Sequence, residues 1–469
     1  MTPADAAAAP PVSVRSLSLA VLADHRASGR FAEDVLDSAL AAAAMAPRDR
    51  GLARELVLGT IRHRATLDAV AAVFSNRPLA QVEPEVLDAV RIGLYQLTFL
   101  ERIPPFAAVG ETVEALRSRG KPAAIGFVNG ILRSVLRDLD GRRPQPADPR
   151  RDVPLGPGRY MAFRRPVLPD PSDAAVFLAA AHSYPIALVR RWLQRHGRDR
   201  TEALLAAGNQ PPPVVLRANR RRIARDALVA RLIADGIAAQ PAAHPSAVVL
   251  DKPGRPLVEM PAFAEGLATA QDVTAIEVGE ALEPQPGEMV LDLCAAPGGK
   301  STHLAELMDD RGLVLAGDVS DEKLAMIAAG AARLGLTMIR TVRADRLDET
   351  VSAEGAFDRA LADVPCSNTG VLSRRAEARW RFRGEDLGPL SLQQLALLRQ
   401  AGRAVRPGGL LVYSTCSIEP EENQRVVEAF LDGRPGFRLR DQTLTLPEAG
   451  PSAAGWRDGG FRARLERVG

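Results

Sequence analysis

At residues 291–300 the chain reads Leu291-Asp292-Leu293-Cys294-Ala295-Ala296-Pro297-Gly298-Gly299-Lys300. Its apolar start is typical of a strand, and the two adjacent glycines allow the backbone to pass close to a ligand. A helix is predicted from Lys300, and the free N–H groups of its first turn would face that ligand. A strand, a glycine-rich turn and a helix in this order predict a nucleotide or cofactor site in an α/β sheet.

Strands and helices alternate on both sides of this stretch. Apolar runs predict five strands, over 289–293, 313–316, 338–342, 359–362 and 409–413. Helical patterns fill the gaps, over 300–308, 321–334, 391–405 and 420–431. This alternation predicts an α/β Rossmann-like domain over 285–469, with a doubly wound and mostly parallel sheet.

The rest of the chain predicts three further segments. Residues 14–140 form an all-α domain of four to seven helices, because Leu87, Val90, Leu94 and Leu97 recur at helical spacing. Residues 141–172 are rich in Pro, Arg and Asp, which is the composition of a linker. Residues 173–284 mix helices with short strands and predict a small α/β lobe.

Composition bounds the class of protein. The chain has 469 residues, 46% of them hydrophobic and 25% charged, as in globular proteins of two or three domains. No run approaches the eighteen apolar residues of a membrane span. The first residues, Met1 to Asp5, carry no basic stretch, so no secretory signal is expected. Three cysteines suit a reducing compartment, and we expect a cytoplasmic protein, a monomer without a membrane partner.

Positive charge is concentrated between residues 141 and 222. This segment holds 16 arginines, no lysine and 6 acidic residues, a local balance of +10, whereas the whole chain carries only +3. A basic block of this kind predicts a polyanionic partner, with nucleic acid before membrane. We therefore expect Arg142, Arg143, Arg150 and Arg151 to neutralise phosphates. The alternative is a composition bias, because arginine is abundant and lysine is rare throughout the chain.

Two aspartates mark the ends of the next predicted strands. Asp318 lies 20 residues after Gly298, where a Rossmann-type site places the carboxylate that accepts hydrogen bonds from ribose hydroxyls. Asp345 ends the third strand and could reach the adenosine edge. Aspartates in this order on successive strands predict a cofactor that contains a nucleoside.

The loop itself discriminates between cofactors. Gly299-Lys300-Ser301 resembles the end of a phosphate-binding P-loop, but the first glycine of that motif would fall on Cys294. Pro297 also removes a backbone donor from the turn that would hold phosphates. No G-x-G-x-x-G follows a strand, which disfavours a dinucleotide dehydrogenase. S-adenosylmethionine, which has ribose and adenine but no phosphate, fits best, and an NTPase remains the alternative.

Two thiols follow two other predicted strands. Asp363-Val364-Pro365-Cys366-Ser367 follows one apolar run, and Tyr413-Ser414-Thr415-Cys416-Ser417 follows another. C5 of cytosine is a poor nucleophile, but a thiolate that adds at C6 makes C5 able to attack a methyl sulfonium. That reaction needs a nucleophilic cysteine, an acid such as Asp363 and a second group that handles protons. Cysteine peptidase chemistry is disfavoured, because neither cysteine motif contains any of the six histidines.

These motifs together resemble a known family. The stretches 293–300, 363–370 and 413–417, followed by Pro420-Glu421-Glu422-Asn423, closely resemble the RNA cytosine-C5 methyltransferases of the Nol1/Nop2/Sun type. Asp49-Arg50-Gly51-Leu52-Ala53, Gly93-Leu94-Tyr95-Gln96-Leu97 and 127–133 are similar to the NusB-like RNA-binding domain of one bacterial branch. That branch, the small-subunit ribosomal RNA methyltransferase B (Sun/Fmu) family, also matches at 182–185 and 216–219.

The resemblance implies roles that the residues alone leave open. It implies a class I methyltransferase that uses S-adenosylmethionine and modifies C5 of a cytosine in 16S rRNA. It makes Cys416 the nucleophile and gives Cys366 a part in product release, with Asp363 beside them. The cofactor would be bound by residues 294–300 and by Asp318, Asp345 and Asp363, and no metal site is predicted. Two alternatives are an RNA-binding assembly or antitermination factor with an inactive methyltransferase domain, and an RNA-dependent NTPase that uses Lys300.

Overall fold

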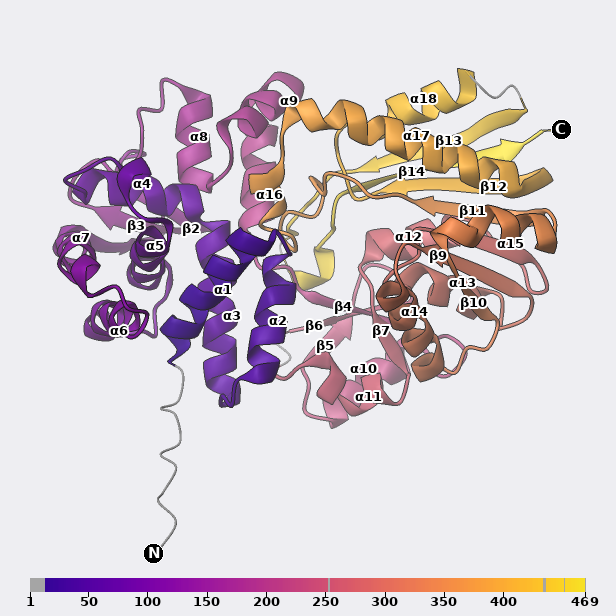
Figure 1. Ribbon diagram of the computed structural model, residues 1–469, viewed down its shortest axis with the longest axis horizontal. Helices are drawn as coiled ribbons and strands as arrows, with labels where there is room; N and C mark the ends of the chain where they lie inside the picture. Colours follow the sequence, from indigo (N-terminus) through magenta and orange to yellow (C-terminus); the bar gives the residue numbers. More distant parts are fainter. Residues whose placement is uncertain (1–12, 252–253, 433–435, 451, 469) are drawn as a thin grey trace, which may run out of the picture. The chain divides into compact units, whose positions relative to one another are not determined.

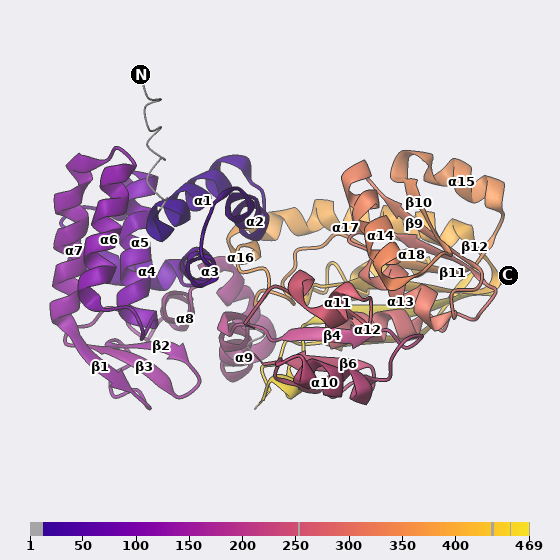
Figure 2. The same cartoon turned by 90° about the horizontal axis from the view of Figure 1, so that it is seen from below.

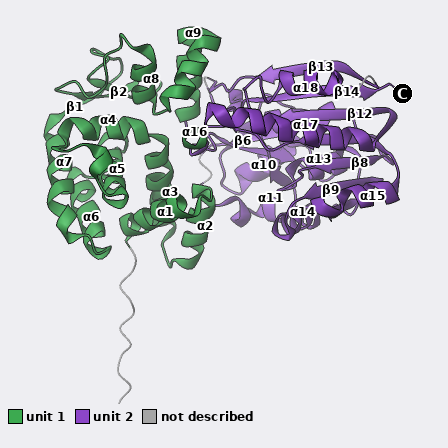
Figure 3. Cartoon of the chain, turned by 45° about the horizontal axis from the view of Figure 1, so that its top comes forward, with its two compact units in different colours: residues 1–209, 379–381 green, residues 210–378, 382–469 purple. Residues whose placement is uncertain are grey.

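The computed structural model describes residues 13–251, 254–432, 436–450 and 452–468. The stretch Met1 to Asp5, considered above as a signal, lies outside them. The chain divides into two compact units (Figure 3), residues 1–209 with 379–381 and residues 210–378 with 382–469.

The first unit begins with a bundle of helices (Figure 1). Its seven α-helices are α1 (Val14–Ser28), α2 (Ala32–Ala42), α3 (Pro47–Arg62), α4 (Arg64–Phe74), α5 (Pro84–Phe99), α6 (Pro105–Ser118) and α7 (Ile125–Asp138). Proline occupies the first turn of α3, α5 and α6, where its missing N–H costs no hydrogen bond. All residues from Val86 to Thr98 of α5 are buried, so this helix is the core of the bundle. The predicted all-α domain is confirmed, at the upper end of the expected number of helices.

A three-stranded sheet follows the bundle, where the sequence predicted a linker. The strands β1 (Leu139–Arg143), β2 (Asp152–Gly156) and β3 (Arg159–Phe163) pair antiparallel in the order β1-β3-β2. Val153 and the end of β3 from Met161 to Phe163 are buried, while most of β1 is exposed. The sequence did not predict this sheet because its strands are short, include Pro and Gly, and bury few side chains.

Two further helices complete this unit, α8 (Ala174–His182) and α9 (Ile186–Asn209), which bends at Gly197. Residues 379–381, from the end of the short helix α16 (Ala378–Arg381), also belong to it. Arg379 is fully buried there, stacks on Tyr184 and donates hydrogen bonds to the Ser183 carbonyl (3.1 Å) and the Asn209 side chain (2.6 Å). Among the described residues, no helix combines the length and the apolar character that a membrane span requires.

The second unit contains a small four-stranded sheet in the order β5-β6-β4-β7. Its strands are β4 (Val214–Ala218), β5 (Ala239–Pro241), β6 (Ala247–Leu250) and β7 (Ala268–Ala270). The helices α10 (Arg225–Ala234) and α11 (Pro261–Ala264) contribute Leu228, Leu232 and Ala262 to its core. This sheet precedes the main sheet in the chain, but the predicted lobe over 173–284 also included α8 and α9, which belong to the first unit because they pack there.

The main sheet of this unit has seven strands in the order β10-β9-β8-β11-β12-β14-β13. The strands are β8 (Met289–Leu293), β9 (Leu313–Asp318), β10 (Ile339–Arg343), β11 (Phe357–Asp363), β12 (Val405–Thr415), β13 (Phe437–Thr445) and β14 (Gly460–Arg467). The pairs from β10 to β12 are parallel, and β14 pairs antiparallel with both β12 and β13. All five predicted strands are present, and the last two were not predicted.

Helices cover both faces of this sheet (Figures 1 and 2). On one face, Val290 and Leu361 pack with α12 (Val273–Ala281), α13 (Gly299–Leu307) and α14 (Asp321–Leu334). On the other, Leu291 and Ala360 pack with α15 (Leu347–Glu354), α17 (Leu387–Ala404) and α18 (Gln424–Asp432). Neighbouring residues of one strand point to opposite cores, which is why these strands are continuous apolar runs. The doubly wound Rossmann-like fold is confirmed.

Candidate active site

The three motifs found in the sequence follow three adjacent strands. β11 pairs with β8 on one side and with β12 on the other, all parallel, so their carboxyl ends lie at the same edge of the sheet. Cys294 follows β8, Cys366 follows β11 and Cys416 follows β12. The structure therefore brings the predicted cofactor loop and the two predicted thiols to one edge, where α/β sheets bind ligands.

The loop after β8 is held open by its backbone. Cys294 has a φ of 65°, and the N–H of Ala295 donates to the Gly317 carbonyl at 2.9 Å. Gly298 has a φ of 102°, and a Cβ there would lie 3.1 Å from Ile327 Cα, so only glycine fits without strain. Helix α13 starts at the next residue, and the N–H groups of its first turn lie at the end of the loop.

Asp318 closes β9 directly against this loop. Its buried carboxylate accepts hydrogen bonds from the N–H groups of Ala296 (2.9 Å) and Val319 (2.7 Å) and from Lys323 Nζ (3.0 Å). Burial alone would raise the pKa of Asp318, but these donors hold it below its usual value. Asp318 is therefore an ionised acceptor beside the cofactor loop.

Asp345 lies in a different setting. It is exposed in the short turn that follows β10, and the Arg343 guanidinium donates to it at 3.1 Å. That hydrogen bond lowers the pKa of Asp345. The structure places it two residues after the end of β10, the third strand in the predicted series.

Two ionisable groups at the start of the loop, Asp292 and Cys294, have raised pKa values. Burial raises the pKa of Asp292 to about 7, and its carboxyl accepts a hydrogen bond from Ser301 Oγ at 2.6 Å. Burial, together with the neighbouring carboxylates, raises the pKa of Cys294 to about 12. Cys294 therefore stays a thiol at neutral pH, and its contribution to the loop is its backbone.

Lys300 and Asp363 form an ion pair between the cofactor loop and the end of β11. Lys300 Nζ donates to Asp363 Oδ2 at 2.6 Å, and Ser414 Oγ donates to Asp363 Oδ1 at 2.6 Å. Burial alone would lower the pKa of Lys300, but Asp363 raises it above the ordinary value. A lysine engaged in this way is a fixed positive charge at the carboxyl end of β11.

The two thiols are in contact. Cys366 Sγ lies 2.9 Å from Cys416 Sγ, and Cys416 Sγ donates to Asn368 Oδ1 at 3.2 Å. The hydrogen bond with Cys416, and then burial, raise the pKa of Cys366 well above its usual value. Cys366 therefore stays protonated and can donate a hydrogen bond to the Cys416 sulfur. Asn368, whose role the sequence did not suggest, has a φ of 61° that turns its side chain back to the thiols.

A buried carboxylate holds the two thiol loops together. Glu422 is fully buried and accepts hydrogen bonds from the Ser367 N–H (2.8 Å), from Gln394 Nε2 (3.0 Å), and from the hydroxyls of Ser367 and Ser417. Ser367 follows Cys366 and Ser417 follows Cys416, so one side chain fixes the residues after both thiols. Sequence reasoning quoted Glu422 as part of a motif but assigned it no role. Its position six residues after Cys416, in a quartet with Asn423, was the available signal.

Asn423 completes this support. Its amide donates to the Ser417 carbonyl at 2.9 Å and accepts from Thr415 Oγ1 at 2.6 Å. Both contacts lie inside the turn that carries Cys416, and Asn423 is fully buried. The turn that carries Cys416 is thus held in place by buried polar side chains around it.

Three protein-family models match the chain. "16S rRNA methyltransferase RsmB/F" matches residues 279–453, the NusB family matches 12–137, and a ferredoxin-like domain of the RsmF/B-like methyltransferases matches 184–256. A protein of Bacillus subtilis named "Probable ribosomal RNA small subunit methyltransferase B" is 34% identical over 91% of this chain and 89% of its own length. The chain belongs to the RsmB/F family of 16S rRNA methyltransferases.

Other comparisons agree with membership of the RsmB/F family. "Ribosomal RNA small subunit methyltransferase B" of Salmonella arizonae is 35% identical over 90% of this chain and 91% of its own length. The crystal structure of a methyltransferase homolog from Pyrococcus horikoshii is 27% identical, with a TM-score of 0.54, and covers 63% of this chain and 99% of that one. The chain is therefore an enzyme, a methyltransferase of a family that depends on S-adenosylmethionine.

The residues at the edge of the sheet fit that cofactor. The loop excludes a side chain at Gly298, and the buried Asp318 offers an ionised acceptor suited to ribose hydroxyls. Lys300, which a P-loop would direct at phosphates, is instead paired with Asp363. The set of donors and acceptors suits a nucleoside without a phosphate.

Proposed function

We propose that this enzyme methylates C5 of one specific cytosine in 16S rRNA through a covalent bond between Cys416 and C6 of the base. The observation that carries the proposal is the contact of the two thiols, 2.9 Å apart, at the edge of the sheet that also holds the cofactor loop. One thiol attacks and the other assists it, so a pair serves this reaction better than a single thiol. An rRNA substrate would place the enzyme in the cytoplasm.

Cys416 is the nucleophile in this proposal. Its thiol gives up its proton to a base such as Asp363, its sulfur then forms a bond to C6, and the electrons of the C5–C6 double bond make C5 nucleophilic. Asn368 orients the thiol before attack, and Cys366, which stays protonated, donates to the sulfur as it becomes a thiolate. Asp363 ends the strand that Cys366 follows, and together with the cation of Lys300 it would hold a proton and balance charge on the polar edge of the base.

Release reverses the attack. A base removes the proton from C5, the C5–C6 double bond forms again, and the sulfur departs with the electrons of the C6–S bond. A hydrogen bond from Cys366 to the departing sulfur stabilises the thiolate that leaves. Cys366 thus has its largest effect on release.

The cofactor would be held by backbone and carboxylates. Residues 294–300 would form the loop, Asp318 would accept from the ribose, and Asp345 and Asp363 would contact the rest of the cofactor. When bound, S-adenosylmethionine supplies an electrophilic methyl group. The chain's own task is to place the C5 atom against that group and to exclude water from it.

The two alternatives lose support at specific residues. An NTPase needs Lys300 free for phosphates, whereas Asp363 holds it at 2.6 Å. An RNA-binding factor with an inactive domain has no need for a buried carboxylate that fixes both thiol loops. Equilibrium binding of labelled S-adenosylmethionine and of ATP to the purified chain separates these alternatives from the methyltransferase.

Bisulfite sequencing of 16S rRNA tests the proposed function. Methylated cytosines resist conversion, so a strain that lacks this gene should lose protection at one position. The wild-type gene should restore protection, and the Cys416→Ser variant should not. An unchanged conversion pattern in the deletion strain would contradict the proposal.

A further inference from the structure

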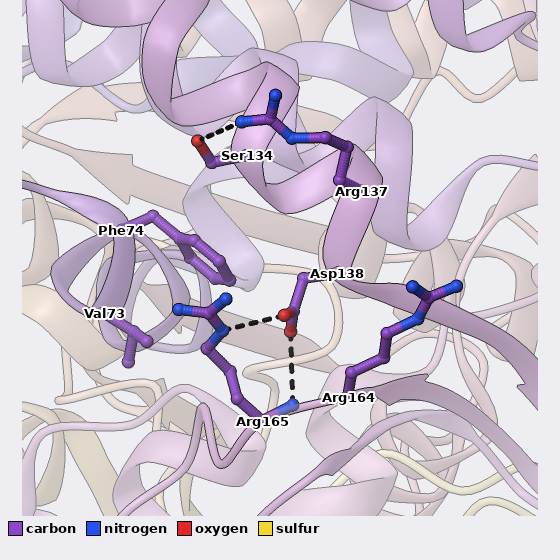
Figure 4. A pocket seen from close by; sticks show the side chains of 7 residues that line it. All are labelled: Val73, Phe74, Ser134, Arg137, Asp138, Arg164 and Arg165. Carbon is purple, nitrogen blue, oxygen red and sulfur yellow. Dashed lines mark hydrogen bonds and ion pairs between the residues drawn. The ribbon is translucent and has the colours of Figure 1, made fainter.

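The end of helix α7 and the turn after β3 form an open groove in the first unit (Figure 4). The groove has a volume of about 640 Å³ and is lined by Val73, Phe74, Ser134, Arg137, Asp138, Arg164 and Arg165. Three guanidinium groups meet one carboxylate there, so the groove has a local surplus of two positive charges. Arg164 and Arg165 also lie outside the range that the NusB family matches.

Asp138 and Arg165 form an ion pair in the groove, which leaves Arg137 and Arg164 available to bind a ligand. Asp138 is buried, and it accepts a hydrogen bond from Arg165 Nε at 2.7 Å and from the Arg165 N–H at 3.3 Å. The Arg165 guanidinium also lies over the Phe74 ring, 5.1 Å from its centre. Figure 4 shows Arg165 under Phe74 and Arg164 on the opposite side of Asp138. The Asp138 charge is therefore neutralised by Arg165.

Arg137 and Arg164 carry the surplus charge. The Arg164 side chain is 67% exposed, and its contact with Asp140 is 4.0 Å long. Asp140 is closer to Arg143, at 2.5 Å. Arg137 donates to Ser134 Oγ at 3.1 Å, and within the described ranges no carboxylate forms an ion pair with it. Both guanidinium groups can therefore exchange water for phosphate oxygens at little cost.

The positive surface continues along α7. Phe127 precedes Ser134 by seven residues and Asp138 by eleven, so the three share one face of the helix. The exposed Arg77 guanidinium lies 4.2 Å from the centre of the Phe127 ring. Two cation–ring pairs, Arg77 with Phe127 and Arg165 with Phe74, lie near the two ends of about 17 Å of helix, which suits a polymer with phosphates and bases better than a single small anion.

We infer that Arg77, Arg137 and Arg164, which we call the α7 stripe, bind the phosphate backbone of the rRNA substrate. The inference rests on the proposed function for the identity of the RNA. The arginines that the sequence favoured for this role are engaged elsewhere. Arg142 pairs with Glu101 (3.2 Å), Arg150 with Asp170 (3.8 Å) and Arg151 with Asp148 (3.2 Å). They offer a control with an identical change of net charge.

The test compares two triple variants of the full-length chain. One carries Arg77→Gln, Arg137→Gln and Arg164→Gln, and the control carries Arg142→Gln, Arg150→Gln and Arg151→Gln. Binding of a labelled 16S rRNA transcript is measured at several salt concentrations. Each phosphate contact contributes about 0.7–0.9 to the magnitude of the slope of log K against log salt, so the stripe variant should lower that magnitude by about two to three. The control should keep the wild-type slope, and both should bind S-adenosylmethionine as the wild type does.

Each other outcome overturns the inference in a distinct way. Equal slopes for the stripe variant and the wild type exclude phosphate contacts at the stripe. Equal losses in both variants show that only net charge matters. If the stripe variant binds and methylates the transcript normally but fails on the small ribosomal subunit, the stripe contacts a protein instead. Failure of the wild-type chain to bind or methylate rRNA overturns the proposed function itself, which separates the two claims.

Discussion

The buried ion pair between Arg217 and Glu306 should be among the most costly contacts to break in the second unit. Arg217 lies in β4 and Glu306 in α13, and both side chains are 1% exposed. The guanidinium donates to both carboxylate oxygens, Nη2 to Oε1 at 2.8 Å and Nε to Oε2 at 3.1 Å. It also donates to the Gly299 carbonyl at 3.1 Å, at the first residue of the helix that follows the cofactor loop.

Replacing Arg217 with methionine keeps the bulk of the side chain and removes its charge. Burial raises the pKa of Glu306, and Arg217 opposes that rise, so the variant leaves a carboxylate buried with less compensation. Removal of one partner from a buried pair costs about 3–5 kcal/mol. The pKa of Glu306 should rise further in the variant. The loss of unfolding free energy should therefore be largest at high pH, and smaller below the unfolded pKa of about 4.3.

Hydrogen exchange of peptides from β4 and α13 measures the free energy of opening in this region, and so the loss in the variant. The double variant Arg217→Met with Glu306→Leu should recover most of the loss, because an apolar pair of similar volume can replace a buried ion pair. The affinity for S-adenosylmethionine should fall in the single variant, since Arg217 fixes the start of α13. If Arg217→Met lowers the unfolding free energy by less than about 1 kcal/mol, or if the double variant is no more stable than the single one, the ion pair does not have the predicted importance.

Two further substitutions test the cofactor side of the site. Asp318→Ala removes an ionised acceptor worth about 1.5–3 kcal/mol, so calorimetry should show S-adenosylmethionine binding weakened by roughly 10- to 150-fold; unchanged affinity would remove Asp318 from the site. Asp292 has a pKa of about 7 in the folded chain against about 3.9 unfolded, so its stabilising contribution is present below pH 4 and is lost as the pH rises through 7. Over that pH interval the melting temperature of the Asp292→Asn variant should rise relative to that of the wild type. Parallel plots of melting temperature against pH for the two proteins would contradict the raised pKa.

The parts of the fold that the sequence predicted share one property. Strands such as β8 and β9 are short apolar runs bounded by glycine or aspartate, because both of their faces are buried under helices. β13 alternates exposed and half-buried residues, with Arg438 and Arg440 on its surface, and no apolar run marks it. The sheet β1-β3-β2 was missed because its strands are short and bury few side chains.

The candidate site was predictable where its residues are local in sequence. The loop 294–300 and the two cysteine motifs each lie within a few residues, and parallel strands bring them together by a general rule. The contacts that support them connect distant positions. Glu422 reaches Ser367, 55 residues away, and Arg217 reaches Glu306, 89 residues away. Pairing of this kind depends on the packed fold, which periodicity does not encode.

The assignment of the two thiols is tested most directly by trapping the protein–RNA bond. The Cys366→Ala variant is incubated with 16S rRNA and S-adenosylmethionine and run on a denaturing gel. A slow band that contains both protein and RNA should accumulate, because attack and methyl transfer proceed while the sulfur leaves poorly. The band should need the cofactor, and it should disappear when Cys416→Ser is added. A covalent band in Cys416→Ser alone, with none in Cys366→Ala, would contradict the account and exchange the roles of the two cysteines.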